Sequence, residues 1–142
     1  MRDDKYFYPE IEDIFVGYEC ESTSNEERWY KWKFEQHNFP ALDLEILNNM
    51  YRTPYLTQEQ IENEGWEKIA VYRDGGTTIF SFKGTKFLYE LTYKGQQHLT
   101  PSNKVIITEI RETVDRPVRD NIYKGECKDI NTFRKILKLL NI

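Results

Sequence analysis

Alternating apolar and polar positions begin near the N-terminus, and this period of two is typical of strands with one buried face. Residues 12–21 and residues 28–35 both alternate in this way, and the polar residues 22–27 separate them. The two segments therefore predict a β-hairpin with a six-residue connection. The expected core faces comprise Ile14, Val16, Tyr18 and Cys20 in the first strand and Tyr30, Trp32 and Phe34 in the second.

A short helix is predicted further along the chain, where both its start and its stop are encoded. Thr57 and Gln60 fit a capping box, in which each side chain accepts a hydrogen bond from the backbone of the other. Gly65 supplies the left-handed residue that ends a helix. We therefore predict two helical turns between these signals. Residues 37–52 have no decisive period, and we expect irregular to extended structure there.

A series of strands separated by turn residues follows, and it predicts an antiparallel meander. The strongest turn signal is Asp74-Gly75-Gly76, and further turns are expected at Gly84 and near Gly95. The expected strands cover residues 69–72, 77–83, 86–94, 104–112 and 121–128, with a loop at 115–120.

The last predicted element is an amphipathic helix with Asn131 as its N-cap. Its apolar positions recur at helical spacing and comprise Phe133, Ile136, Leu137 and Leu140. The pattern as a whole predicts an α+β fold: a largely meander antiparallel sheet, one short capped helix and a C-terminal helix packed on the sheet. The length of 142 residues and the lack of a Gly-, Ser- or Pro-rich linker predict a single domain, 1–142.

Composition adds that the core should be aromatic. The apolar share is 39%, below the usual ~45–50%, but the chain has ten Tyr, eight Phe and three Trp. Cys20 and Cys127 fall in predicted strands, so we expect two buried free thiols in a reducing compartment. The N-terminus lacks the apolar run of a signal peptide, and no stretch approaches the length of a membrane span. These features predict a cytoplasmic protein with no membrane partner.

The net charge of −4 is unevenly distributed. Residues 1–70 hold 7 Lys/Arg against 16 Asp/Glu, whereas residues 71–142 hold 13 against 8. An acidic and a basic binding face would produce this asymmetry, and so would charged outer faces that serve solubility. The charges are interleaved with apolar residues, which favours the second interpretation.

Three segments of the chain resemble a group of uncharacterised small proteins. They are PEIEDIFVGYECE, YLTQEQIENEGWEK and YKGECKDINTFRKILKLLNI, in this order. The similar proteins are encoded by tailed bacteriophages of gut bacteria and by related prophages. The resemblance implies a phage accessory gene, and it implies no activity, cofactor or catalytic residue.

Motifs that carry chemistry are missing from the sequence. There is no phosphate-binding glycine loop, no nucleophile elbow and no CxxC pair, so we expect neither an enzyme nor a cofactor. Cys20 could meet His37 or His98, but its place on an apolar strand face indicates an inert thiol. Glu19 and Glu21 share a strand face and offer a weak alternative as metal ligands.

Two sets of residues are candidates for binding. Trp29 lies beside Lys31 and Lys33 on the face opposite the expected core, where it could contact a partner or be covered by the hairpin end. The second set consists of Arg111, Arg116 and Arg119, near the loop at Pro117. A pI near 5.3 argues against a general nucleic-acid binder.

Three functional hypotheses follow from these features. The first is a non-catalytic binding protein, a phage accessory product that engages a host protein, such as a defence factor. The second is a protein that sequesters a nucleotide signal, held by aromatic rings and arginines in a homo-oligomer. The third is a minor virion protein.

Overall fold

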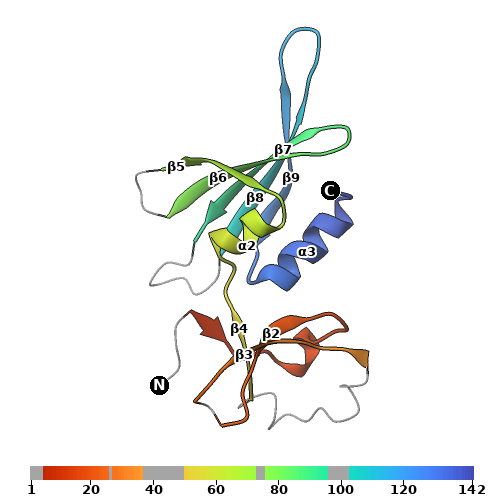
Figure 1. Ribbon diagram of the computed structural model, residues 1–142. Coiled ribbons are helices and arrows are strands. Elements are labelled where there is room, and N and C mark those ends of the chain that lie inside the picture. The colour runs from red at the N-terminus through yellow and green to blue at the C-terminus, as the bar shows by residue number, and fades with distance from the viewer. Residues whose placement is uncertain (1–4, 26, 37–49, 73–75, 96–102) are drawn as a thin grey trace. The chain divides into compact units, whose positions relative to one another are not determined.

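The computed structural model describes residues 5–25, 27–36, 50–72, 76–95 and 103–142 (Figure 1). The chain forms two compact units, Met1–Tyr55 (unit 1) and Leu56–Ile142 (unit 2). Each unit contains one antiparallel sheet. Together with the described helices, these sheets make the fold a mixed α+β fold. The predicted fold class is therefore confirmed. The single domain remains a prediction, because two compact units can belong to one cooperative domain or to two.

Unit 1 contains a four-stranded sheet in the order β1-β4-β2-β3. Its strands are β1 (Tyr6–Phe7), β2 (Glu19–Ser22), β3 (Tyr30–Lys33) and β4 (Tyr51–Pro54), and a 3-10 helix, η1 (Ile11–Asp13), follows β1. The antiparallel pairing of β2 with β3 confirms the predicted hairpin. Strand β4 begins within the stretch that has no decisive period, residues 37–52. Most of that stretch, residues 37–49, falls outside the described residues.

The first hairpin strand and its core face differ from the prediction. Gly17 has a φ of +94°, so the extended backbone begins only after it, and Val16 is 60% exposed. Tyr30 and Trp32 were expected in the core but are 59% and 37% exposed, whereas Phe34 is fully buried. The reason is that the core gathers near the Phe34 end of the hairpin and does not extend to Tyr30, which faces Ser22. This core consists of Ile14, Tyr18, Cys20 and Phe34.

Unit 2 contains a five-stranded sheet in the order β5-β6-β7-β8-β9, which confirms the meander. Its strands are β5 (Glu67–Val71), β6 (Thr77–Lys83), β7 (Leu88–Lys94), β8 (Lys104–Arg111) and β9 (Val118–Glu126). The loop expected at 115–120 is shorter than predicted, since β9 already begins at Val118. The register of the β8–β9 pair shifts between Ile107 and Thr108, and this lets β9, the longer strand, stay paired with β8.

Helix α2 (Gln58–Asn63) confirms the signals read from the sequence. The Thr57 hydroxyl accepts from the Gln60 backbone N–H at 3.2 Å, and the Gln60 side chain accepts from the Thr57 N–H at 3.1 Å. Gly65 ends the helical segment with a φ of +98°. A Cβ at this position would lie in ordinary van der Waals contact with the ring of Phe82, at 3.4 Å, so it is the backbone conformation that favours glycine.

Helix α3 (Ile130–Leu139) is capped by Asp129, which corrects the prediction of Asn131 as N-cap. Asp129 has an extended backbone, and its carboxylate accepts from the backbone N–H of Thr132 at 3.2 Å. Asn131 lies within the first turn and donates its side-chain N–H to Asp129 at 2.7 Å. The chain therefore enters the helix two residues earlier than the apolar pattern suggested.

One face of the five-stranded sheet packs against α2 and α3 (Figure 1). The sheet contributes Phe80, Leu91 and Ile107, which lie side by side in register, and α3 contributes Phe133, Ile136 and Leu137. This arrangement confirms a C-terminal helix packed on the sheet. No helix in the described parts of the chain has the length and apolar character needed to cross a membrane.

Candidate functional site

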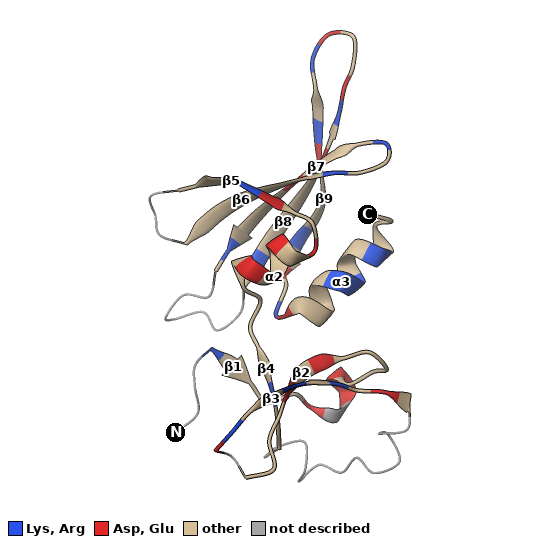
Figure 2. Cartoon of the chain, in the orientation of Figure 1, with Lys and Arg blue, Asp and Glu red and all other residues tan. Residues whose placement is uncertain are grey.

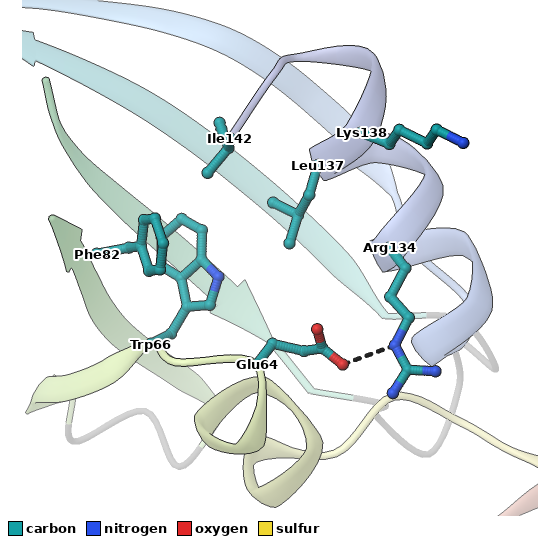
Figure 3. A pocket seen from close by; sticks show the side chains of 7 residues that line it. All are labelled: Glu64, Trp66, Phe82, Arg134, Leu137, Lys138 and Ile142. Atoms are coloured by element: carbon teal, nitrogen blue, oxygen red, sulfur yellow. Dashed lines mark hydrogen bonds and ion pairs between the residues drawn. The ribbon is translucent and has the colours of Figure 1, made fainter. Parts of the chain in front are cut away.

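A hollow of about 320 Å³ lies in unit 2 where the end of α2, strand β6 and helix α3 meet (Figure 3). Its lining comprises Glu64, Trp66, Phe82, Arg134, Leu137, Lys138 and Ile142. The left-handed turn at Gly65 directs the chain from α2 to Trp66. The Trp66 ring then stacks on Phe82, with centroids 5.1 Å apart. We call this hollow the Trp66 pocket.

Trp66 carries the most informative polar group of the pocket. The residue is only 2% exposed, and its indole Nε1 is buried without a hydrogen-bond partner. The indole nitrogen can only donate, and a buried donor without an acceptor costs about 1–3 kcal/mol. Such groups are rare in folded proteins and call for an acceptor, either ordered water or a ligand. In Figure 3 the indole nitrogen points toward the space between Glu64 and Leu137.

Charged side chains occupy the other side of the pocket. The Nε of Arg134 lies 2.6 Å from Oε1 of Glu64, so an ion pair links α3 to the end of α2 across the hollow (Figure 3). Lys138 lies one helical turn beyond Arg134 and is exposed. The Glu64 carboxylate neutralises Arg134, which leaves the Lys138 ammonium as the positive charge of this rim.

This arrangement can bind a small molecule with three chemical features. An acceptor atom would satisfy the Trp66 N–H, and an apolar body would lie along Phe82, Leu137 and Ile142. A negative charge on the same molecule would face Lys138. The volume of about 320 Å³ lies at the lower end of the range of ligand pockets, about 300–1,000 Å³, and this limits the ligand to a small molecule.

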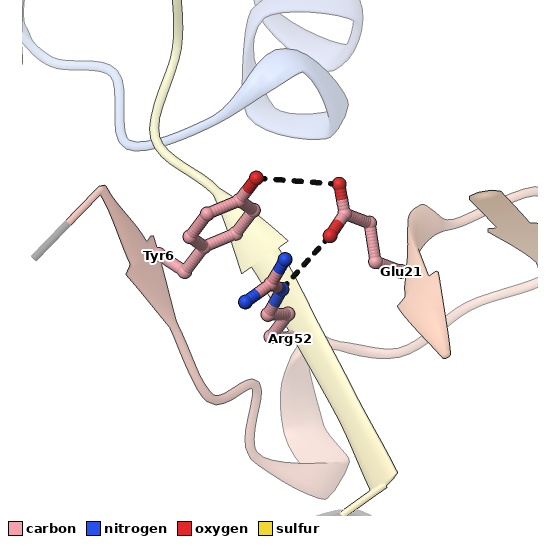
Figure 4. Close-up of polar contacts among 3 residues, drawn as sticks. All are labelled: Tyr6, Glu21 and Arg52. Atoms are coloured by element: carbon pink, nitrogen blue, oxygen red, sulfur yellow. Dashed lines mark hydrogen bonds and ion pairs between the residues drawn. The ribbon is translucent and has the colours of Figure 1, made fainter. Parts of the chain in front are cut away.

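The structure places Trp29 in unit 1, half-buried against Arg52 rather than free at the surface. The Arg52 guanidinium lies 4.3 Å from the Trp29 ring centroid and 3.8 Å from that of Tyr6. Glu21 completes the cluster, accepting from Arg52 Nε at 2.8 Å and from the Tyr6 hydroxyl at 3.4 Å (Figure 4). Trp29 thus helps to hold an arginine within its own sheet.

Lys31 and Lys33 are exposed on β3, directly opposite Glu21 and Glu19 of β2. Opposite charges at facing positions stabilise an antiparallel pair modestly. Glu21 is engaged by Arg52, so Glu19 and Glu21 do not form a free pair of carboxylates. Within the described residues, no group of three or more His, Cys, Asp or Glu is placed to hold a metal ion.

The three candidate arginines do not converge. Arg111 pairs with Glu109 at 3.5 Å and also with Asp120, whereas Arg119 pairs with Glu90 at 3.2 Å. In the register of β8 and β9, Arg111 faces Val118 and Arg119 faces Ile110, which puts the two guanidinium groups on opposite faces of the sheet. Arg116 is exposed in the loop between these strands.

Both cysteines are free and buried, as predicted. Burial, and secondarily the charge of Glu21, raises the pKa of the Cys20 thiol to about 12. Burial and the charge of Asp129 raise the pKa of Cys127 as well. The reactive thiolate is therefore scarce at neutral pH at both positions. His37 and His98, the bases considered as partners of Cys20, lie outside the described residues.

Known proteins offer no guide to this chemistry. Comparison of the chain with family models, curated proteins and solved structures gave no match. The pocket must therefore be interpreted from its own side chains.

Sequence reasoning did not identify the Trp66 pocket. The sequence pattern shows Trp66 only as an apolar residue directly after the glycine stop, and it places Arg134 and Lys138 only outside the apolar stripe of the last helix. Their approach depends on how α3 crosses the sheet, and neither spacing nor composition encodes that crossing. A Trp directly after a glycine stop is the only local signal, and it indicates packing.

Proposed function

We propose that the chain is a non-catalytic binding protein and that unit 2 binds a small organic acid in the Trp66 pocket. The observation that carries this proposal is the buried Nε1–H of Trp66, which has no acceptor and faces a hollow of about 320 Å³. A carboxylate oxygen would accept this hydrogen bond, and Lys138 would add charge complementarity at the rim.

The surroundings of the pocket support binding rather than catalysis. Its lining offers no thiol or hydroxyl to act as a nucleophile and no imidazole to act as a base. The one carboxylate in the lining, that of Glu64, forms an ion pair with Arg134. Elsewhere in the described residues, both thiols are buried with raised pKa values, which disfavours nucleophilic chemistry there too.

The test is a titration of ¹⁵N-labelled protein with a panel of small aliphatic and aromatic carboxylic acids, followed by NMR. The three tryptophans give three indole N–H signals, so Trp29 and Trp32 serve as internal controls. We expect a binding acid to shift the Trp66 signal downfield and to leave the other two in place. Equal shifts of all three signals, or none with any acid, would refute the proposal.

A matched pair of variants sharpens this test. Lys138→Gln removes the rim charge, and Lys135→Gln makes the same change on the same helix outside the pocket lining. We expect only the first to weaken binding, by several-fold, since the ammonium is partly solvated. Equal affinities in both variants would show that the acid is not held in this pocket.

A protein partner is the second candidate function, and strand β5 supports it. This strand forms one edge of the five-stranded sheet, and Ile69, Val71 and Tyr72 are 54%, 60% and 55% exposed. An edge strand with exposed apolar side chains can accept a strand of another chain. The resemblance to phage proteins suggests a host protein as that partner.

Capture from lysate of the bacterial host, using tagged protein and mass spectrometry, tests this second function. Val71→Lys places a charge on the edge, which should abolish capture. Val114→Lys is the matched control, because Val114 is fully exposed in the loop between β8 and β9. Capture of the same protein by all three forms would exclude β5 as the contact.

A further inference from the structure

A second hollow, of about 550 Å³, lies on the sheet face opposite the helices of unit 2. Its lining comprises Thr92, Lys94, Lys104, Ile106, Lys124, Gly125 and Glu126, from β7, β8 and β9. The register explains the side: Leu91 and Ile107 point into the core, so their neighbours Thr92 and Ile106 point away from it. This hollow is separate from the Trp66 pocket and belongs to unit 2 alone.

The three lysines gather here because of strand pairing. Lys94 lies directly opposite Lys104 in the β7–β8 pair. Lys124 lies opposite Ile106 in the β8–β9 pair and is therefore a diagonal neighbour of Lys104. Two like charges at facing positions destabilise an antiparallel pair. A fold gains nothing from this arrangement unless another group neutralises it.

The three ammonium groups form no close ion pair with an acidic side chain of the described residues. None of the three lysines forms an ion pair within 4 Å with a described carboxylate, although Glu126 faces Lys104 in register. Other basic side chains of the same sheet, Arg111 and Arg119, do have carboxylate partners. The floor of the hollow, Thr92 and Ile106, carries no charge.

We infer that this trilysine site binds the di- or triphosphate group of a small soluble molecule. Three ammonium groups around a hollow supply charge-assisted hydrogen bonds from several directions to an oxyanion with many acceptors. The site spans two inter-strand spacings, about 10 Å, which suits one compact polyphosphate group. An extended nucleic-acid backbone fits less well, because unit 2 has a net charge of only +2, from fourteen Lys/Arg and twelve Asp/Glu (Figure 2).

Inorganic pyrophosphate is the probe, and isothermal titration calorimetry at low salt is the measurement. We expect binding by the full chain that weakens as NaCl is added. Lys94→Gln should weaken it about tenfold, the lower end for the loss of one charged hydrogen bond. Glu126→Gln removes the negative charge at the rim and should tighten it.

The control is Lys83→Gln, which makes the same charge change on the same sheet face. Lys83 faces Leu88, six residues from Lys94 along β7 and hence about 20 Å away. We expect this variant to bind pyrophosphate as the wild type does. Equal weakening by Lys83→Gln and Lys94→Gln would show only diffuse attraction to a basic surface, and absence of pyrophosphate binding would overturn the inference.

A second measurement keeps the inference testable without any ligand. In buffer of low ionic strength without phosphate or other multivalent anions, Lys94→Gln should raise the melting temperature by about 1–3 °C, because it relieves the repulsion with Lys104. Pyrophosphate should then stabilise the wild type more than this variant at the same concentration. A single-stranded oligonucleotide is the last probe. If it bound more tightly than pyrophosphate at equal phosphate concentration, the ligand of this site would be a nucleic acid and not a small molecule.

Discussion

The guanidinium of Arg52 contacts two aromatic rings and one carboxylate, and these contacts join three of the four strands of unit 1. Tyr6 belongs to β1, Glu21 to β2 and Arg52 itself to β4. A planar, always-charged group can stack on a ring and bind a carboxylate at the same time, whereas a lysine cannot reproduce both contacts. A single side chain therefore contributes to the cohesion of a sheet whose strands are at most four residues long.

Substitution of Arg52 by lysine tests this role. Arg52→Lys keeps the charge but loses the stacking, and we expect the free energy of unfolding to fall by about 1 kcal/mol. Urea denaturation measures it, and Arg28→Lys, at an exposed loop position, is the matched control. Equal stability of the two variants would mean that the ring contacts contribute nothing.

The buried thiol of Cys20 predicts a loss of stability in alkali. Its pKa is raised from 9.0 to about 12 in the folded chain, so the folded state keeps a proton that the unfolded state releases. Its contribution is intact below pH 9 and decreases as the pH rises toward 12, at up to about 1.4 kcal/mol per pH unit. Cys20→Ala should therefore flatten the dependence of unfolding free energy on pH between 9.5 and 10.5, and an unchanged slope would contradict the raised pKa.

At the scale of elements, the ends of the helices depend on a few polar residues. Helix α3 begins where the Asp129 carboxylate binds Thr132, and its negative charge also suits the positive end of the helix dipole. Asp129 is 3% exposed, so its acceptors have little access to water as a substitute partner. The cap thereby sets the residue at which α3 begins.

Asp129→Ala should lower the free energy of unfolding by about 1–2 kcal/mol, because the N-terminal N–H groups of α3 lose their acceptor. Asp129→Asn retains one side-chain oxygen and should cost less. Guanidinium denaturation followed by circular dichroism provides both values. A larger loss for the asparagine variant would indicate that charge, rather than the acceptor, is what α3 requires.

At the scale of the molecule, the charge asymmetry follows the two units. Unit 1 holds twelve Asp/Glu against six Lys/Arg, and unit 2 holds twelve against fourteen, so their net charges are −6 and +2 (Figure 2). The cores are also unequal among the described residues. Unit 1 buries a cluster of four residues, and unit 2 buries one of fourteen. Because buried apolar area dominates stability, the two units should resist unfolding to different extents.

The two cysteines report on this difference, because Cys20 belongs to unit 1 and Cys127 to unit 2. Thiol labelling at increasing urea concentration, with mass spectrometry to locate the label, follows each separately. We expect Cys20 to become reactive at a lower urea concentration than Cys127. Coincident transitions would instead support the single cooperative domain that the chain length predicts.

The sequence by itself determined those elements whose physics is local. The capping box at Thr57 and the stop at Gly65 need only neighbouring backbone groups, and the meander follows from turn residues and a period of two. Even here, the sequence pattern misplaced the start of the last helix. Asn131 and Asp129 are both good N-caps, and which of them caps the helix depends on where β9 ends.

Only the tertiary structure decided which faces are covered and which charges meet. Tyr30 follows the same alternation as Phe34, but one is exposed and the other buried, because the core of unit 1 gathers near Phe34 and does not extend to Tyr30. The Trp66 pocket depends on the crossing of α3 over the sheet, and the facing lysines, Lys94 and Lys104, depend on the β7–β8 register. These properties arise between residues far apart in the chain, and local pattern carries no information about such distances.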